Sequence, residues 1–585
     1  MGQTFQIFKR RRCVKKIRVA IVGIYLPGIY PRGDNSVVAD LLAPAFLKAA
    51  ADADPEISQK YEINILNLPA SLSGEQIALK ILDVNPAIIA YSVYIWNYNL
   101  VYESSRLIYE SQRSLPIIWG GPQVSYNSFE MMKANPQVKM IVCGSGETRF
   151  KLLLKTNLQL ERLVQIPGIT YRDNQGNIKQ TEGSIFEDLS KIPSPYQTKT
   201  IDLEDNRRHC VFIETARGCL FKCGYCMAKG EQEKGLNLFP IEQILRDIEI
   251  IYNRPNVAEV VFTDSCILYN RDRAKLIIEK ILSCSRKIPT VFTLDIAFLD
   301  EEMVKELSKL QLSHQQFFFG MQSTNKRTLQ LMNRRIDTDI FIKKVALLRK
   351  INPATEISFD LIYGLPGDNF EIFKETIEFA LMLSPIKLNF SPLLLLPGSP
   401  FWEKREEYGF VFEDKPPHQV FYNKYFSIED MEKARTLVLK VILVMYFPAI
   451  REIIYKISDQ NAIYRRLELI QRLIEIFENT ANFSIDGTDK TAQQQDFIKS
   501  NNMVKKRIMD QVAQPENCLY AYRATLQLLK EVNMEHLAED ILLGMDYYKT
   551  LCSGNVGRGE DIISQKYNSK QIKWIKLNWV VSKSE

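Results

Sequence analysis

Short apolar runs alternate with longer amphipathic segments from residue 16 to about residue 155. The runs with the character of buried strands are Ile17–Gly23, Ile63–Leu68, Ala87–Val93, Ile117–Gly121 and Lys139–Cys143. Between them, apolar residues recur at helical spacing in Val38–Ala51, Gly74–Asp83 and Leu100–Gln112. Strands that alternate with helices are typical of a parallel sheet with helices on both faces. We therefore expect residues 16–155 to form a doubly wound, Rossmann-like α/β domain.

A second alternating series follows a polar, turn-rich stretch over residues 156–208, which predicts a linker. From residue 209 to residue 424 the expected strands are Cys210–Thr215, Glu259–Thr263, Thr290–Asp295, Gln316–Met321, Glu356–Tyr363 and Lys387–Leu394. The expected helices are Ile241–Tyr252, Arg271–Ser283, Glu301–Leu310, Thr328–Met332, Phe341–Lys350 and Phe370–Met382. Six strand and helix units predict a partial (β/α)6 barrel related to the TIM architecture, in which reactive groups come from the loops after the strands.

The strand pattern stops at about residue 425. Ser427–Asp430 resembles a capping box at the start of a long helix. Apolar residues then recur at helical spacing at Ile463, Leu467, Ile470, Ile474 and Phe477. Residues 484–500 are polar and rich in glutamine, which predicts a mobile loop. The pattern predicts an α-helical domain over residues 425–585.

The composition is that of an ordinary globular protein, with 46% apolar and 25% charged residues. The net charge of +6, from 75 basic and 69 acidic residues, is small and mostly scattered, so we expect no nucleic-acid partner. The longest apolar stretch, Val441–Ile450, is far shorter than the roughly 20 residues that span a bilayer. No secretory signal precedes the first strand. These features predict a cytoplasmic protein with no membrane span.

Three cysteines carry the strongest chemical signal. They lie in Thr215-Ala-Arg-Gly-Cys219-Leu-Phe-Lys-Cys223-Gly-Tyr-Cys226, directly after the first expected barrel strand. A loop with this spacing can wrap three thiolates around one 4Fe-4S cluster and leave the fourth iron without a protein ligand. S-adenosylmethionine can chelate that iron and be cleaved by an electron from the cluster. A zinc site, the main alternative, normally needs a fourth protein ligand nearby.

The pattern Cys-x3-Cys-x-aromatic-Cys resembles the signature of the radical S-adenosylmethionine superfamily. Gly320–Ser323, Asp360–Gly367 and Leu396–Pro400 resemble the motifs at the ends of strands four, five and six of its barrel. A single Gly-Pro pair is more often a glycine turn that closes a strand, but the order and spacing of the three segments make the joint match specific. The resemblance implies that Cys219, Cys223 and Cys226 hold the cluster and start the chemistry. It also implies contacts to S-adenosylmethionine from Tyr225, Gln322, Ser323 and Asp360. Asp264 and Asp295, like Asp360, lie at the ends or edges of apolar strands, where a buried carboxylate needs a partner, and a ribose hydroxyl, the methionyl ammonium of S-adenosylmethionine or a neighbouring arginine would each serve.

The N-terminal domain resembles the cobalamin-binding domain of one subgroup of this superfamily, in a branch with a C-terminal helical domain of unknown function. Its glycine turns and the Tyr94-Ile-Trp-Asn97 segment carry the resemblance. The implied cobalamin contacts are Tyr25, Ser92, Tyr94, Trp96, Gly120, Gly121, Pro122, Gln123, Gly144, Gly146 and Glu147. A purely structural domain that has lost the corrin is the alternative.

The N-terminal domain contains no histidine, although many cobalamin domains supply one to the lower face of cobalt. We expect cobalamin to bind without a protein nitrogen on cobalt, with its lower face toward water or toward Tyr94 or Trp96. His209 adjoins the first barrel strand and is expected to be a hydrogen-bonded structural residue. Cys143, Cys210 and Cys266 are expected to be inert core residues.

The leading interpretation is a cobalamin-dependent radical methyltransferase that acts on an unactivated carbon. The resemblance implies that one S-adenosylmethionine recharges the corrin with a methyl group and that a second supplies a 5′-deoxyadenosyl radical. The expected partners are a small-molecule or peptide substrate and an external electron donor such as flavodoxin or ferredoxin.

Three alternatives stay open. One is a cobalamin-dependent radical cyclase or oxidoreductase without methyl transfer. Another is an RNA methylthiotransferase, which should carry a second N-terminal cysteine triad and a C-terminal β-barrel. The last is a non-catalytic cofactor carrier, which would produce no 5′-deoxyadenosine.

Overall fold

The computed structural model describes residues 16–29, 34–228, 235–310, 312, 316–335, 337–353, 355–481, 510, 514–552 and 570–571. The chain divides into two compact units. The first comprises Met1–Phe221, Met227–Thr293 and Glu306–Ser313, and the second comprises Lys222–Cys226, Leu294–Lys305 and His314–Glu585. The mobile loop predicted at residues 484–500 lies outside the described residues.

The first unit begins with a seven-stranded sheet in the order β3-β1-β4-β5-β6-β7-β8. Its strands are β1 Ile17–Tyr25, β3 Tyr61–Pro69, β4 Ile88–Ser92, β5 Ile117–Gly120, β6 Met140–Val142, β7 Ile169–Arg172 and β8 Ile178–Gln180. The first five pair in parallel, and β7 and β8 add antiparallel. The helices are α1 Leu42–Asp52, α2 Pro55–Lys60, α3 Gly74–Asp83, α4 Tyr98–Ser111, α5 Pro122–Ser125, α6 Ser128–Ala134, α7 Glu147–Lys155 and α8 Leu160–Leu163.

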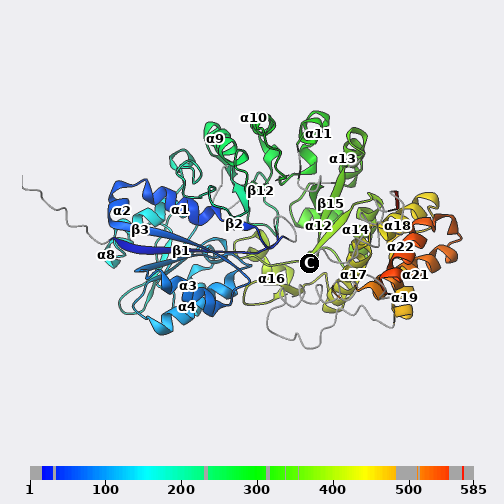
Figure 1. Cartoon of the computed structure of the whole chain (residues 1–585). Coiled ribbons are helices and arrows are strands. Elements are labelled where there is room, and N and C mark those ends of the chain that lie inside the picture. The colour runs from blue at the N-terminus through cyan, green and yellow to red at the C-terminus, as the bar shows by residue number, and fades with distance from the viewer. Residues whose placement is uncertain are drawn as a thin grey trace, which may run out of the picture. The chain divides into compact units, whose positions relative to one another are not determined.

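Side chains of β1 alternate between two buried layers, which is the doubly wound arrangement expected from the sequence. Ala20 and Val22 pack into a core that also contains Ile77 of α3. Val19 and Ile21 point to the opposite face, into a core that contains residues of α7. Figure 1 shows α1 and α2 on one side of this sheet and α3 and α4 on the other. Both faces of the sheet are therefore buried.

Two local predictions need correction. The segment predicted as a linker over residues 156–208 contains β7 and β8, which extend the sheet. Turn residues dominate the composition of this segment because the two strands are short and form a hairpin. In its turn, the carboxylate of Asp173 accepts a hydrogen bond from Asn177 N at 2.8 Å. Residues 38–40, predicted as the start of a helix, form strand β2 (Val38–Asp40). The strand forms because it pairs in parallel with a barrel strand about 170 residues later in the chain.

The first unit also contains a four-stranded sheet in the order β13-β12-β9-β2. Its barrel strands are β9 His209–Ile213, β12 Val257–Phe262 and β13 Thr290–Val291. A short antiparallel pair, β10 Ala216–Arg217 with β11 Asn237–Leu238, follows β9. The helices are α9 Ile241–Tyr252 and α10 Arg271–Ser283, with the 3-10 turns η1 Leu189–Lys191 and η2 Ile267–Tyr269. The third barrel strand is shorter than predicted, because after Val291 the chain leaves the ladder.

The second unit contains the parallel sheet β14-β15-β16. Its strands are β14 Gln316–Gln322, β15 Glu356–Tyr363 and β16 Lys387–Pro392. The accompanying elements are η3 Ile296–Phe298, α12 Lys326–Leu331, α13 Thr338–Ile351, α14 Phe370–Met382, α15 Pro400–Glu403 and α16 Arg405–Tyr408, with α11 Glu301–Ser308 where the chain passes between the units. A small hairpin, β17 Val411–Phe412 with β18 Val420–Tyr422, follows. The six barrel strands predicted from the sequence are thus present and in the predicted order.

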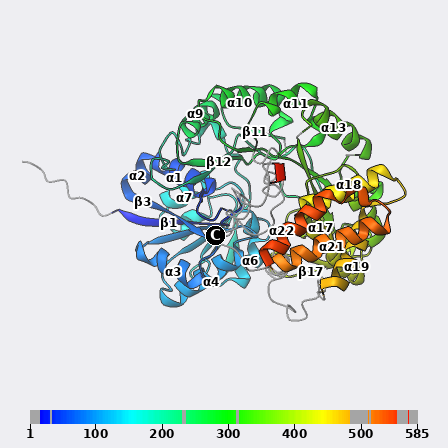
Figure 2. The same ribbon diagram turned by 45° about the vertical axis from the view of Figure 1, so that its right-hand side comes forward.

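Helices dominate the described C-terminal residues of the second unit, as predicted. They are α17 Ile428–Tyr446, α18 Pro448–Gln460, α19 Arg466–Ala481, α21 Pro515–Glu531 and α22 Glu539–Cys552, with the turn η5 Glu535–Leu537. Figure 2 shows them gathered in one group. Ile463 was predicted to lie on the apolar helical face, but it precedes α19 and is 81% exposed. Among the described residues, no helix is long and apolar enough to cross a membrane.

Candidate functional site

The three cysteines of the Cys-x3-Cys-x2-Cys motif follow the carboxyl end of β9. Cys219 belongs to the first unit, and Cys223 and Cys226 belong to the second. All three are partly buried and outside disulfide bonds. Partly accessible thiols are suitable iron ligands, so the donor set fits a 4Fe-4S cluster with one iron left open. In the described part of the chain, no group of three or more His, Cys, Asp and Glu side chains is arranged so that it could hold a metal ion.

In the first unit, the residues before Cys219 are held by the end of β12. Ser265 Oγ donates to Gly218 O at 2.8 Å. The buried carboxylate of Asp264 accepts from Thr215 N at 3.1 Å and from Thr215 Oγ1 at 2.6 Å. Burial raises the pKa of Asp264 against these hydrogen bonds. Asp264, predicted to contact S-adenosylmethionine, therefore fixes the strand end from which the cysteine loop departs.

Arg217, two residues before Cys219, binds a carboxylate of the N-terminal domain. Its Nη2 donates to Glu147 Oε1 at 2.6 Å and its Nη1 donates to Glu147 Oε2 at 3.2 Å. The Nε of Arg217 donates to Glu214 Oε2 at 3.0 Å. The guanidinium also lies 5.6 Å from the ring centroids of Phe46 and Phe239. Arg217 is thus enclosed by two carboxylates and two aromatic rings, which suits its planar charge.

The two carboxylates on Arg217 are close enough to influence each other. Burial raises the pKa of Glu214 to about 7, although Arg217 beside it lowers the pKa. Burial lowers the pKa of Arg217, but the charges of Glu147 and Glu214 outweigh burial, so the pKa of Arg217 is raised. Glu147 was predicted as a cobalamin contact, and its carboxylate in this structure is committed to Arg217. Neither Glu214 nor Arg217 was identified from the sequence, although both lie in the Glu214-Thr-Ala-Arg217 segment that leads into the motif.

In the second unit, Tyr225 of the motif is held by Arg334. Arg334 Nη1 donates to Tyr225 Oη at 3.1 Å, and Arg334 Nη2 donates to Gly320 O at 2.6 Å. Burial raises the pKa of Tyr225 against the lowering effect of Arg334. Gly224 has no room for a side chain, because a Cβ there would lie 2.4 Å from the ring of Phe401. Arg334 has no motif around it and was not identified from the sequence.

Gln322 and Ser323, predicted near S-adenosylmethionine, lie where β14 ends. Gln322 has φ +65°, which is costly for a residue with a side chain, and the pairing of β14 with β15 is irregular between Gly320 and Gln322. Its buried Oε1 has no hydrogen-bond partner in the described structure. Strain, a bulge and an unsatisfied acceptor at a strand end are typical of a ligand contact. Ser323 Oγ instead donates to Asp368 Oδ1 at 3.2 Å.

Asp368 was not identified from the sequence. Its buried carboxylate also accepts from Thr328 Oγ1 at 2.6 Å, and burial raises its pKa to about 6. The other predicted carboxylates have local partners. Asp360 Oδ1 accepts from Asn389 Nδ2 at 2.7 Å, and Asp295 caps η3 by accepting from Ala297 N at 3.0 Å. Both are partly exposed: Asp360 lies within β15, and Asp295 follows β13.

The predicted cobalamin contacts lie at the carboxyl ends of β4, β5 and β6. Tyr94 and Trp96 are stacked, with ring centroids 4.4 Å apart, and Trp96 is 50% exposed. Asn97 holds this segment: its Oδ1 accepts from Tyr94 N at 2.8 Å and its Nδ2 donates to Ser92 O at 3.0 Å. The stacked pair therefore presents a flat aromatic face at the strand ends, where doubly wound domains bind their ligands.

The glycine turns complete this edge of the sheet. Gly121 has φ +115°, and a Cβ there would lie 2.6 Å from Val93 O, so the turn after β5 requires glycine. Gly144 N donates to Ser125 Oγ at 3.1 Å, and Gly146 caps α7. The remaining predicted contacts lie on the same edge: Tyr25 at the end of β1, Ser92 at the end of β4, Gly120 at the end of β5, and Pro122 and Gln123 in α5.

His209 is a hydrogen-bonded structural residue, as predicted. The ring is fully buried, with Nδ1 2.6 Å from Asp40 Oδ2 and Nε2 2.8 Å from Asp205 Oδ1. Burial disfavours the charged ring, but the two carboxylates outweigh burial and raise the pKa of His209. Because both ring nitrogens are occupied, His209 joins β2 and the segment before β9 and has no nitrogen left for a ligand.

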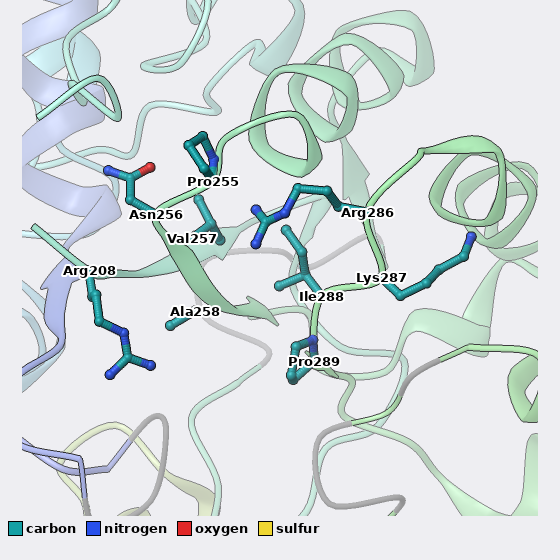
Figure 3. A pocket seen from close by; sticks show the side chains of 9 residues that line it. All are labelled: Arg208, Pro255, Asn256, Val257, Ala258, Arg286, Lys287, Ile288 and Pro289. Carbon is teal, nitrogen blue, oxygen red and sulfur yellow. The ribbon is translucent and has the colours of Figure 1, made fainter. Parts of the chain in front are cut away.

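A cavity of about 370 Å³ lies elsewhere in the first unit (Figure 3). It is lined by residues at the amino ends of β9, β12 and β13, whereas the cysteine loop leaves the carboxyl end of β9. Its three cationic side chains are already engaged. Arg208 pairs with Asp34 at 2.5 Å, Arg286 donates to a backbone carbonyl, and Lys287 donates to two carbonyls of the preceding turn. This cavity is therefore separate from the candidate site.

Comparison with protein families identifies the two α/β parts of the chain. Residues 213–380 match the model of the radical SAM superfamily, and residues 45–154 match the model of the B12 binding domain. The first match begins at the end of β9 and includes the three cysteines. The second includes the turns after β4, β5 and β6 that carry most of the predicted cobalamin contacts.

Relatives and a solved structure agree with these matches. An uncharacterised methyltransferase of Pyrococcus horikoshii is 22% identical over 59% of this chain and 75% of that protein. The cobalamin-dependent radical SAM methyltransferase TokK of Streptomyces tokunonensis is 25% identical over 63% of this chain, and the match spans 55% of TokK. The cobalamin-dependent S-adenosylmethionine radical enzyme OxsB, solved with aqua-cobalamin and S-adenosylmethionine, is 14% identical and matches 97% of this chain and 84% of its own, with a TM-score of 0.55. The likeness to OxsB is one of fold and includes the helical C-terminal part.

Proposed function

The chain belongs to the radical SAM superfamily and carries a B12-binding domain, and on that premise we propose that it is a cobalamin-dependent radical methyltransferase. The acceptor is an unactivated carbon of a small molecule or peptide. Methyl transfer to such a carbon is beyond polar chemistry, and this is the reaction for which the two cofactors are suited. When bound, they supply a 5′-deoxyadenosyl radical and a transferable methyl group.

One observation carries the proposal: Arg217, at the entrance to the cysteine motif, is bound by Glu147 of the turn after β6. Glu147 lies inside the segment that matches the B12 binding domain, and Arg217 lies inside the radical SAM match. A domain kept only for structure does not need a buried bidentate ion pair at its ligand-binding edge. The pair supports the proposal that the turn after β6 binds the corrin and is held in place against the segment that leads into the cysteine loop.

We assign the roles of the chain's own residues accordingly. Cys219, Cys223 and Cys226 hold the cluster. Gln322 offers its unsatisfied amide oxygen to S-adenosylmethionine, and Ser323 is oriented by Asp368 for the same ligand. Tyr225, Asp264, Asp295 and Asp360 shape that site, and Asp264 does so by fixing Thr215 at the end of β9. The aromatic pair Tyr94 and Trp96, with the glycine turns after β5 and β6, holds the corrin.

Two further points follow from the proposal. The chemistry requires an external one-electron donor, for which a flavodoxin or ferredoxin is the proposed partner. The alternative of an RNA methylthiotransferase requires a C-terminal β-barrel, whereas residues 428–481 and 514–552 are helical apart from short connections. A radical enzyme without methyl transfer would form 5′-deoxyadenosine but no S-adenosylhomocysteine. The test must therefore measure both products.

The experiment reconstitutes the whole chain anaerobically with iron, sulfide and cobalamin, and then supplies S-adenosylmethionine and dithionite. We expect both 5′-deoxyadenosine and S-adenosylhomocysteine, because the radical and the methyl group come from separate molecules of S-adenosylmethionine. The control is the triple variant Cys219→Ala, Cys223→Ala and Cys226→Ala, which should hold no cluster and form neither product. 5′-Deoxyadenosine without S-adenosylhomocysteine would replace the proposal with the non-methylating radical enzyme, and failure to retain cobalamin would reject it.

A further inference from the structure

The turn after α12 holds the middle of the cysteine motif through consecutive residues. Gly224 N donates to Met332 O at 2.9 Å. Asn333 Nδ2 donates to Lys222 O at 3.0 Å. These bonds fix the backbone on both sides of Cys223. All the residues belong to the second unit, so the turn and this half of the motif form one local structure.

Arg334, the next residue, adds a charge to this arrangement. Its Nη1 bonds to Tyr225 Oη and also lies 4.0 Å from Cys223 Sγ, within hydrogen-bond reach of sulfur. Its Nη2 is anchored on Gly320 O of β14. The guanidinium is therefore held against the motif from two sides, with one terminal nitrogen directed toward a proposed iron ligand.

The positive charge of Arg334 is not neutralised by an ion pair. In the described structure, no carboxylate lies within ion-pair distance of its guanidinium, and its buried Nε has no hydrogen-bond partner. The carboxylate of Asp295 acts on the charge of Arg334 only from beyond that distance. A guanidinium keeps its charge at any pH at which the protein is folded. An unpaired, partly buried cation is costly. It is tolerable where an anion is expected close by, and a thiolate-ligated cluster is such an anion.

We propose that Arg334 is a positioning residue for the cluster, which holds Cys223 and Tyr225 in place and makes the cluster easier to reduce. The inference rests on the proposed function, because it requires the cluster. Hydrogen bonds to the sulfur ligands and local charge set the reduction potentials of iron–sulfur clusters. A fixed cation beside Cys223 stabilises the added electron of the reduced state and so raises the midpoint potential.

The test compares Arg334→Gln with Arg335→Gln. Arg335 is the adjacent arginine, is exposed, and forms no hydrogen bond or ion pair in the described structure, so its variant removes the same charge from the same turn. Each reconstituted protein is titrated with a reductant without S-adenosylmethionine, and the reduced cluster is followed by electron paramagnetic resonance. Iron and sulfide per chain are measured in parallel.

At the wild-type midpoint potential, we expect the ratio of reduced to oxidised cluster in Arg334→Gln to be about tenfold lower, which is a shift of ~59 mV to more negative values for a one-electron couple. Arg335→Gln should match the wild type. Equal potentials for Arg334→Gln and the wild type, with full iron content, would overturn the inference. If the glutamine variant holds no cluster, Arg334→Lys decides, because it keeps the charge on a side chain without the forked donors. A variant that regains the cluster with a midpoint potential close to that of the wild type then supports the inference, and one whose potential is ~59 mV or more below that of the wild type rejects it. A wild-type protein that assembles no cluster would instead reject the proposed function.

Discussion

The carboxylate of Glu147 accepts hydrogen bonds from both terminal nitrogens of Arg217, in a bidentate pair that is almost entirely buried. Glu147 begins α7 at the ligand-binding edge of the N-terminal sheet, and Arg217 lies in β10, two residues before Cys219. The pair thus joins two segments about 70 residues apart within the first unit. The ion pair therefore connects the turn after β6 to the entrance of the cysteine motif.

The Glu147→Gln variant tests the strength of this connection. Removal of one partner of a buried ion pair usually costs roughly 3–5 kcal/mol. Because Glu214 still compensates the charge of Arg217, we expect a smaller loss in the free energy of unfolding, about 2 kcal/mol. Urea unfolding of the cofactor-free protein measures the loss. Glu130→Gln is the control, since Glu130 is exposed and forms no ion pair in the described structure; equal stability of the two variants would contradict the expectation.

The sequence predicted the two alternating series because each depends on local periodicity. The bounds of α3, Gly74–Asp83, were predicted correctly because the helix carries its own start signal, the capping box of Ser73 and Gln76. Strand β2 was missed, because three residues carry too little pattern and their partner strand is distant in the chain.

The residues of the candidate site also fall into those that a local sequence pattern predicts and those that it does not. The cysteines and glycine turns were identified because their chemistry depends on spacing within a short segment. Arg217, Arg334 and Asp368 were missed because their roles come from partners that only the fold brings near. Glu147 shows the intermediate case: its turn was recognised as functional, but its partner Arg217 was not predicted.

The pair of carboxylates around His209 predicts a pH dependence of stability. Since the pKa of His209 is raised in the folded protein, protonation stabilises the fold. This contribution is fully present below the unfolded pKa of about 6.5 and is lost as the pH rises through the higher folded pKa. We expect the free energy of unfolding to fall in the wild type as the pH rises from about 6.5 through the higher folded pKa, and to fall less in His209→Gln.

Urea unfolding across this pH range gives the comparison. His536→Gln is the matched control, because His536 is exposed and lies in the C-terminal helical part. Identical pH profiles for the wild type and His209→Gln would show that the two carboxylates do not hold a proton on the ring.

The contact between Gly224 and Phe401 predicts a strict size limit inside the motif. A Cβ at position 224 would lie 2.4 Å from a ring that is 1% exposed and cannot move away freely. Overpacking of this kind costs about 1–3 kcal/mol, and here the cost falls on the loop between two proposed iron ligands. We expect Gly224→Ala to lose most of its iron after reconstitution, and the double variant Gly224→Ala, Phe401→Leu to recover part of it. Full iron content in Gly224→Ala would contradict this packing argument, and Phe401→Leu alone serves as the control.

The last prediction concerns the lower face of cobalt. The N-terminal domain contains no histidine, and the nearest one in the chain after it, His209, has both ring nitrogens bound to carboxylates. No imidazole of the first unit is therefore available, and the edge of the sheet offers the stacked rings of Tyr94 and Trp96 instead.

We expect cobalamin to bind with its own base displaced and without a protein nitrogen on cobalt. A cobalamin bound without an axial donor would supply its methyl group to a carbon radical more readily. The electron paramagnetic resonance spectrum of the Co(II) form should lack nitrogen superhyperfine splitting from an axial ligand, and Trp96→Ala should weaken cobalamin binding about tenfold, as the loss of an aromatic contact worth ~1.4 kcal/mol would. Axial nitrogen splitting in the wild type would refute the prediction whatever the affinity of the variant, because either the cofactor's own base or a protein nitrogen would then occupy the lower face of cobalt.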